Sequence, residues 1–450
     1  MLSLVSIFVL FIGLGNSKST IKRLPGYPDD LPFTLETGYI GVREHENVQL
    51  FYYFIESENN PSEDPLLLYL TGGPAVSGLS SILYQIGPLS FNLENSWKKN
   101  ITFDLNPNSW TKMANMIFLD APAGTGFSYA KTWEALKSSD SILALDIYEF
   151  LKKWLLEHPK FQRNPLYVSG ISYMGLLIPI VVSEIYNGNE CGHEPIMNFK
   201  GYIMVSPFTD KVADYNSRIE YAHRLALISD DIYKSTVINC KGDYENTNQE
   251  NQLCAQNLQR VDECTTGINL ENILMPKCSL VNPEPYCPDA THVFLVEWAN
   301  NKDVQNALGI REGTIETWEY SNIANRYDHG KNDTIMYSYD VLSSFEYQQQ
   351  LTTKNCQVLI ISGDHDMVVP YVGVEKWIEA LNIPTEIPWK PWLLLKQIAG
   401  YQMTYVHKGY SLKYATIKGS GHVVALAKPK ELLSMVSGWL ASQTYSSISF

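Results

Sequence analysis

The sequence has no excess of basic residues. Its 450 residues include 34 lysines and arginines against 48 aspartates and glutamates, a formal net charge of −14. A surplus of negative charge repels phosphate backbones and anionic lipid surfaces, so we expect neither nucleic acid nor a membrane surface as a partner. Internal repeats, low-complexity tracts and long blocks of like charge are also lacking, which excludes a repeat architecture. The hydrophobic content of 45% is sufficient for a large folded core.

Apolar runs long enough to span a bilayer are absent as well. Residues 1–17 form a shorter apolar stretch that ends in small residues, which predicts a secretory signal peptide over 1–19, although no Lys or Arg precedes it. We therefore expect a mature protein without a membrane anchor, delivered to the extracellular space or the vacuole. Asn100 and Asn332 begin sequons that become glycosylation sites in a secreted chain.

The seven cysteines lack metal-ligand spacing with neighbouring histidines, which argues against a zinc site. Five of them fall in the polar stretch 240–287, while Cys191 and Cys356 stand alone. An odd number leaves at least one free thiol. A bridge between Cys240 and Cys254 would stabilise the fold by roughly 3 kcal/mol in the loop-entropy model. We expect no metal and no organic cofactor.

Residues 166–175 have the pattern of a nucleophile elbow. A short apolar run of strand-forming residues ends in Gly170-Ile-Ser172, and the apolar residues 176–185 have the character of a helix. Such a strand–turn–helix lifts a serine hydroxyl above the edge of a sheet and places the next backbone N–H at a helix N-terminus. The strict pattern has glycine two residues after the serine, where this chain has Met174. By itself this signal is weak, because Gly-x-Ser turns are common.

An acid and a base follow the serine in the chain order of α/β-hydrolases. A buried-strand pattern at 358–363 runs into Asp364-His-Asp366, and a second, beginning at Tyr414, leads through a glycine-containing loop to His422. In a Ser–Asp–His triad the histidine takes the serine proton, and the aspartate fixes its tautomer and stabilises the imidazolium. Two aspartates compete for the third position. Alternation favours Asp366, which leaves Asp364 as a residue that stabilises the turn.

Strands and helices alternate along most of the chain, which predicts a largely parallel, doubly wound α/β sheet. From 211 to 300 the pattern changes to helices and a cysteine-bearing polar stretch, which we interpret as an insertion, or cap, over the catalytic edge. The core then comprises 20–210 and 301–450. The expected strands and helices lie at 36–55, 65–71, 116–120, 143–158, 166–170, 176–185, 201–206, from 357, from 413 and at 428–443.

From about residue 24 to its C-terminus the chain resembles the serine carboxypeptidase family, and the resemblance implies the α/β-hydrolase fold. Residues 31–42 and 49–54 look specifically like the plant serine carboxypeptidase-like branch, some of whose members are acyltransferases that use 1-O-β-glucose esters. The segments that carry the family resemblance are Leu-Tyr-Leu-Thr71-Gly-Gly-Pro, Gly170-x-Ser172-Tyr-x-Gly175, Ser362-Gly-Asp-His-Asp366 and Gly421-His422.

The resemblance also implies roles for individual residues. It implies Ser172 as nucleophile, Asp366 as the residue that orients the base and His422 as the base. It further implies an oxyanion hole made by the backbone N–H groups of Gly73 and Tyr173. Two such donors stabilise a tetrahedral intermediate by several kcal/mol. The expected substrates are a small-molecule acyl donor and acceptor, or a peptide C-terminus.

The features with which the family binds a peptide carboxylate are missing. The resemblance places an asparagine and two glutamates where this chain has Thr71, Ile171 and Gln85. Two close carboxyls that share a proton suit such enzymes to acidic pH, so we do not expect efficient carboxypeptidase activity here. Threonine is usual in the acyltransferase-like branch, whereas Ile171 and Gln85 depart from that branch too. Met174 and Ala75 add bulk close to the nucleophile.

The resemblance extends to the cysteines. A further family bridge is lost as a unit, because its two positions hold Val76 and Ser321. The three remaining cysteines would be free or buried, and we interpret each as a small apolar core residue. The disulfides that the resemblance implies are Cys240–Cys254 and Cys278–Cys287.

Three functions stay open. An acyltransferase ranks first: Ser172 attacks the carbonyl of a glucose ester, glucose leaves with a proton from His422, and an acceptor hydroxyl takes the acyl group. A hydrolase, either a carboxypeptidase of relaxed specificity or an esterase, runs the same steps with water. A non-catalytic partner that associates with an active paralogue ranks third, and the substitutions Ile171, Met174 and Ala75 keep that hypothesis open.

Overall fold

The computed structural model describes residues 18–97, 100–245, 250–277, 291–322 and 336–446. Most of the predicted signal peptide lies outside the described residues, and so do the sequon at Asn332 and the pair Cys278 and Cys287. Those predictions stay predictions. Asn100, which begins the other sequon, is exposed.

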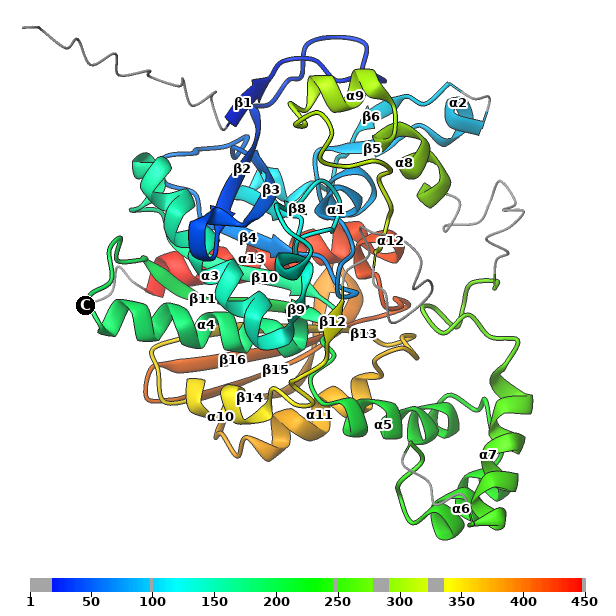
Figure 1. Ribbon diagram of the computed structural model, residues 1–450. Coiled ribbons are helices and arrows are strands. Elements are labelled where there is room, and N and C mark those ends of the chain that lie inside the picture. Colours follow the sequence, from blue (N-terminus) through cyan, green and yellow to red (C-terminus); the bar gives the residue numbers. More distant parts are fainter. Residues whose placement is uncertain (1–17, 98–99, 246–249, 278–290, 323–335, 447–450) are drawn as a thin grey trace, which may run out of the picture.

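A central sheet organises the fold (Figure 1). In the described part of the chain it has twelve strands, in the order β1-β2-β3-β7-β4-β10-β11-β13-β16-β15-β14, with β8 paired to β3. The strands from β7 to β16 in this order run parallel to one another, and the strands on both flanks pair antiparallel. The strands are β1 Lys18–Ile21, β2 Leu35–Val42, β3 Val48–Ile55, β4 Leu66–Leu70, β7 Asn115–Leu119, β8 Tyr129–Ala130, β10 Leu166–Ile171, β11 Phe199–Val205, β13 Gln357–Gly363, β14 Thr385–Leu394, β15 Gln397–His407 and β16 Tyr410–Ile417.

The predicted doubly wound, mostly parallel sheet is confirmed. The structure differs from the prediction in the hairpin of β14 and β15, which was not expected. The sequence pattern predicts no strand between 363 and 413. Most residues of β14 are exposed at the edge of the sheet, and the strand contains Pro388 and Pro391. Proline cannot donate to a sheet ladder and is confined to such edges, so β14 has no buried-strand pattern.

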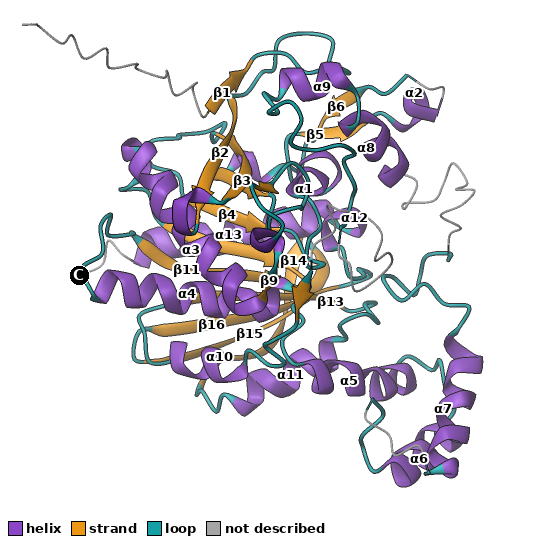
Figure 2. Ribbon diagram, viewed as in Figure 1, coloured by secondary structure: helices purple, strands orange, loops and turns teal. Residues whose placement is uncertain are grey.

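Helices cover both faces of the sheet, and each face has its own hydrophobic cluster (Figure 2). On one face, Phe150 and Trp154 of α3 pack with Leu177 and Val181 of α4. Residues of α1, α8, α9 and α13 form the core on the other face. The helices that flank the sheet are α1 Gly78–Tyr84, α3 Asp140–Glu157, α4 Met174–Glu190, α8 Thr291–Ala299, α9 Lys302–Ala307, α10 Phe345–Leu351, α11 Tyr371–Ala380 and α13 Pro429–Ser446.

The described part of the predicted insertion contains three helices before α8. They are α5 Lys211–Arg224, α6 Asp230–Cys240 and α7 Gln252–Thr265, and Figure 1 shows α6 and α7 projecting away from the sheet. A disulfide joins Cys240 to Cys254, the pairing that the resemblance implies. The indole of Trp298 in α8 donates to the carbonyl of Pro25, 2.7 Å away, so this last helix of the predicted insertion packs on the core. The shorter elements are α2 Leu93–Trp97, α12 Val424–Ala427, β5 Leu89–Phe91, β6 Phe103–Leu105, β9 Ser138–Ser139 and β12 Tyr337–Ser338.

The three cysteines outside this disulfide lie in different environments. Cys356 is buried, as expected of a core residue, but Cys191 and Cys264 are exposed. The core interpretation is therefore wrong for these two, which lie at the end of α4 and on α7. Among the described residues, no helix is both long and apolar enough to cross a membrane.

Candidate active site

The predicted site residues gather where parallel strands end. Gly170 of β10 lies opposite Leu70 of β4, so the loop after β4 and the turn after β10 begin side by side. Asp366 follows β13 and His422 follows β16, two further strands of the same parallel set. Because carboxyl ends of parallel strands share one edge of a sheet, residues distant in the sequence meet there.

Ser172 occupies a strained turn between β10 and α4. Its φ is +60°, a left-handed conformation that costs a non-glycine residue roughly 1–2 kcal/mol. The backbone holds this conformation: the Ser172 N–H donates to Val205 (3.0 Å), and its carbonyl accepts from Gly175 and Phe208 (2.9 Å each). Gly72 approaches the serine so closely that an added Cβ would lie 2.8 Å from Ser172 Cβ. The local geometry is that of the predicted elbow.

The acid and the base form a buried pair. His422 Nδ1 lies 2.7 Å from Asp366 Oδ2, and the two residues are 6% and 0% exposed. The other carboxylate oxygen accepts from the N–H groups of Val368 (2.8 Å) and Val369 (3.0 Å). Burial acts to lower the pKa of His422, but the charge and hydrogen bond of Asp366, together with the charge of Glu271, outweigh it and raise that pKa above its ordinary value.

The competing aspartate has a different task. Asp364 Oδ1 accepts from the N–H groups of Gly419 (2.7 Å) and Ser420 (3.3 Å). It therefore holds the turn that leads to His422 and does not contact the imidazole. Within the described residues Ser172 Oγ and His422 form no hydrogen bond. Hydrogen bonds between a nucleophile and its base are often long in ligand-free structures and tighten when substrate binds.

The two residues of the predicted oxyanion hole border the same cavity as the serine. The N–H groups of Gly73 and Tyr173 have no hydrogen-bond partner within the described residues, and both residues line the cavity beside Ser172. Gly73 has a φ of +125°, and an added Cβ would lie 2.8 Å from Val76 Cγ2. Ala75, where the sequence has one methyl more than glycine, is buried and adopts a left-handed φ of +63°.

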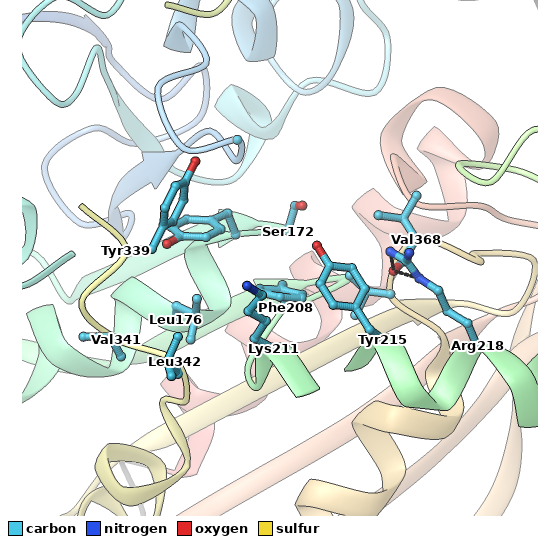
Figure 3. A pocket seen from close by; sticks show the side chains of 13 residues that line it. Ser172, Leu176, Phe208, Lys211, Tyr215, Arg218, Tyr339, Val341, Leu342 and Val368 are labelled. Carbon is cyan, nitrogen blue, oxygen red and sulfur yellow. Dashed lines mark hydrogen bonds between the residues drawn. The ribbon is translucent and has the colours of Figure 1, made fainter. Parts of the chain in front are cut away.

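A cavity of about 280 Å³ opens beside Ser172 (Figure 3). Aromatic and aliphatic side chains dominate its wall, and the only charged lining residues in the described structure are two cations of α5. Tyr173 stacks near Phe208 with ring centroids 6.2 Å apart. The lining residues are Gly73, Ser172, Tyr173, Leu176, Phe208, Lys211, Tyr215, Arg218, Tyr339, Val341, Leu342, Val368 and Val369.

Thr71, Ile171 and Gln85, the positions where the resemblance implies an asparagine and two glutamates, are uncharged and do not border the cavity. All are buried, at 5–7% exposure, and none lines the cavity. Thr71 Oγ1 lies 2.9 Å from Ser81 Oγ, which in turn is 3.4 Å from Gln85 Oε1. Ile171 belongs to the hydrophobic cluster on the α1 face of the sheet. These positions therefore offer a ligand neither charge nor access.

Two structural supports escaped the sequence pattern. Asp140, at the start of α3, accepts from the hydroxyls of Tyr173 (2.6 Å) and Tyr337 (2.9 Å) and from the N–H of Val341 (3.0 Å). Burial raises the pKa of this carboxyl, and the three donors offset the effect only in part. Asp140 thus ties a donor of the predicted oxyanion hole to the cavity wall. The sequence pattern did not predict this role of Asp140, because its partners lie far away in the sequence.

The other support comes from the predicted insertion. Its segment 270–273 forms hydrogen bonds with the loops that carry Asp366 and His422: His422 N–H donates to Glu271 O (2.5 Å), and Met367 N–H donates to Leu270 O (2.9 Å). An added Cβ on Gly421 would collide with the backbone of Glu271, so this position requires glycine. The insertion therefore braces the loops that carry the acid and the base.

The chain also matches known proteins along most of its length. The family model for serine carboxypeptidases matches residues 25–442. The chain belongs to the serine carboxypeptidase family. Serine carboxypeptidase-like 3 of Arabidopsis thaliana is 44% identical over 445 residues, covering 98% of this chain and 97% of that protein. Serine carboxypeptidase-like 17 of the same plant is 42% identical, with coverages of 97% and 96%.

A solved structure in this family has a similar fold. Kex1(Δ)p, a prohormone-processing carboxypeptidase from Saccharomyces cerevisiae, is similar over 94% of this chain and 95% of its own, with a TM-score of 0.73 and 17% identity. This likeness and the family match show the α/β-hydrolase fold. Val76 and Ser321, the two positions where the resemblance implies a further bridge, are neighbours here and form an isolated antiparallel β-bridge.

Proposed function

We propose that the chain transfers an acyl group from a 1-O-glucose ester to an acceptor hydroxyl through an acyl-enzyme on Ser172. The observation that carries this proposal is the buried 2.7 Å pair of Asp366 and His422 on the sheet edge that also carries the strained Ser172. Two backbone donors that have no partner within the described residues complete the arrangement. Membership of the serine carboxypeptidase family supports it.

The reaction has two matched halves. With Nδ1 held by Asp366, His422 Nε2 accepts the Ser172 proton as Oγ attacks the ester carbonyl, and the N–H groups of Gly73 and Tyr173 stabilise the oxyanion. The carbon–oxygen bond to glucose then breaks, and His422 returns the proton to the departing sugar. In the second half the acceptor hydroxyl loses its proton to His422 and attacks the acyl-enzyme. The bond from the acyl carbon to Ser172 Oγ then breaks, and His422 returns the proton to Oγ.

The neutral subsite favours acyl transfer over peptide hydrolysis. Thr71, Ile171 and Gln85 hold no charge with which to recognise a peptide carboxylate through a shared proton. Water is the competing acceptor at the second step, so a hydrolase is the alternative with identical chemistry. We further propose that the chain enters the secretory pathway and is glycosylated at Asn100 and Asn332.

The test is mass spectrometry of the intact, deglycosylated protein after brief exposure to a fluorophosphonate probe. We expect one adduct, which Ser172→Ala abolishes. Ser62→Ala, a change in an exposed loop, serves as the matched control and should leave labelling unchanged. Absence of an adduct on folded protein would contradict both enzyme proposals and favour the non-catalytic partner.

If the probe labels the protein, acyl glucose esters and blocked dipeptides are then tested as substrates. The ratio of acylated acceptor to free acid separates transferase from hydrolase, because both products come from one acyl-enzyme. Release of free acid alone at every acceptor concentration would overturn the transferase proposal and leave the hydrolase.

A further inference from the structure

Helix α5 presents three polar residues to the cavity. Lys211, Tyr215 and Arg218 are four and then three residues apart, a spacing that places side chains on one face of a helix, and all three line the cavity with Ser172. Figure 3 shows the Lys211 side chain rising from α5 with its nitrogen directed toward the space that Ser172 also borders. The first helix of the predicted insertion thus supplies the charge of this pocket.

Arg218 is already engaged by the protein. Its Nε and Nη2 donate to the carbonyl of Val368 (3.1 and 2.7 Å), and its guanidinium lies 4.4 Å from the ring centroid of Tyr215. Because Val368 also donates its N–H to Asp366, Arg218 supports the loop that carries the catalytic acid. Because these contacts hold the guanidinium in place, Arg218 contributes positive charge to the pocket but is not free to move toward a ligand.

Lys211 is different. In the described part of the chain its ammonium group forms no ion pair and no hydrogen bond, and no carboxylate lines the cavity. The acids next to the lining residues have other partners. Asp210 accepts from the Ala213 N–H, Asp214 from the Thr209 and Asp210 N–H groups, and Asp340 from Ser139 Oγ and the Ser141 N–H. Asp366 is paired with His422, and Asp140 with Tyr173. Because no carboxylate among the described lining residues neutralises it, the ammonium group of Lys211 can attract an anion that enters the cavity.

We propose that Lys211 is an anion-binding subsite that holds a carboxylate substituent of the substrate, while the aromatic and aliphatic wall holds its apolar part. The proposal rests on the proposed acyl-transfer function, which makes Ser172 the point of reaction. It assigns the chemical class of one substrate as acidic and places recognition of that acid on α5, away from the neutral positions after β4 and on α1. The carboxylate belongs either to the acyl group or to the acceptor.

The test compares each acid with its neutral amide. Binding of 3-phenylpropanoate and 3-phenylpropanamide, and of lactate and lactamide, is measured by calorimetry on the full chain carrying Ser172→Ala, so that the readout does not require catalysis. We expect one of the two carboxylates to bind about five-fold more tightly than its amide, the size of a partly exposed ion pair. The pair that shows the preference identifies which part of the substrate carries the charge.

Three variants assign the effect. Lys211→Gln should remove the preference for the carboxylate, Lys211→Arg should retain it, and Lys396→Gln, in the exposed turn between β14 and β15, should leave it unchanged. Equal affinities for acid and amide in both pairs, a preference that survives Lys211→Gln, or no saturable carboxylate binding at millimolar concentration would each overturn the proposal. A different result would show that only the proposed acyl transfer is wrong. In that case the fluorophosphonate would not label Ser172, but the Lys211-dependent preference for the carboxylate would remain.

Discussion

Replacing Asp366 by asparagine removes one negative charge from a fully buried pair. The carboxylate oxygen lies 2.7 Å from His422 Nδ1, so the centres of the two charged groups are about 4 Å apart in the transition state. At an effective dielectric constant of about 20, that attraction contributes about 4 kcal/mol. Since each 1.4 kcal/mol or so is a factor of ten, the Ser172 labelling rate should fall about 1,000-fold.

The asparagine also reverses the hydrogen bond. An amide N–H facing Nδ1 favours the tautomer with the proton on Nε2, which cannot accept the Ser172 proton. The assay is the second-order rate of fluorophosphonate labelling, with circular dichroism to establish that the variant folds. Asp364→Asn is the matched control, because its amide oxygen can still accept from Gly419 and Ser420; its rate should stay within about ten-fold of the parent. A loss below ten-fold in folded Asp366→Asn would refute this assignment of the acid.

Three further predictions concern pH and stability. Glu271→Gln removes a charge that raises the pKa of His422, so the acidic limb of the labelling rate should move to lower pH; an unchanged limb would contradict that influence. Cys240→Ser opens the bridge to Cys254 and should lower the free energy of unfolding by roughly 3 kcal/mol, or expose α6 and α7 to proteolysis first. Burial raises the pKa of Asp120 to about 6, so the folded state binds that proton more tightly than the unfolded state. Its contribution should therefore increase the melting temperature as the pH falls from 7 to 4, with a smaller increase in Asp120→Asn.

The sequence was most informative where a short segment carries its own signal. The elbow at Ser172 was predicted because a strand, a turn and a helix follow one another within twenty residues, and the structure has β10 and α4 there. The buried strands β4, β7, β11 and β13 were found for the same reason. The edge strand β14 was missed because solvent, not a core, faces most of its residues.

Long-range contacts account for what the sequence pattern did not contain. Asp140 is 33 residues from Tyr173 and 197 from Tyr337, and nothing local marks it as the shared acceptor of both hydroxyls. The brace formed by residues 270–273 requires the predicted insertion to fold back on the catalytic loops. Cys191 and Cys264 were misassigned because small apolar character does not reveal which side of a helix faces solvent.

The sequence by itself determined the fold class, the order of Ser172, Asp366 and His422 along the chain, and the uncharged character of Thr71, Ile171 and Gln85, because each depends on local pattern or on residue identity. Alternation already favoured Asp366 over Asp364, and only the tertiary structure showed the 2.7 Å contact between Asp366 and His422. It alone also placed Lys211 beside Ser172. A helix of the predicted insertion reaches the cavity only through packing between segments far apart in the chain, and no periodicity within one segment encodes that distance.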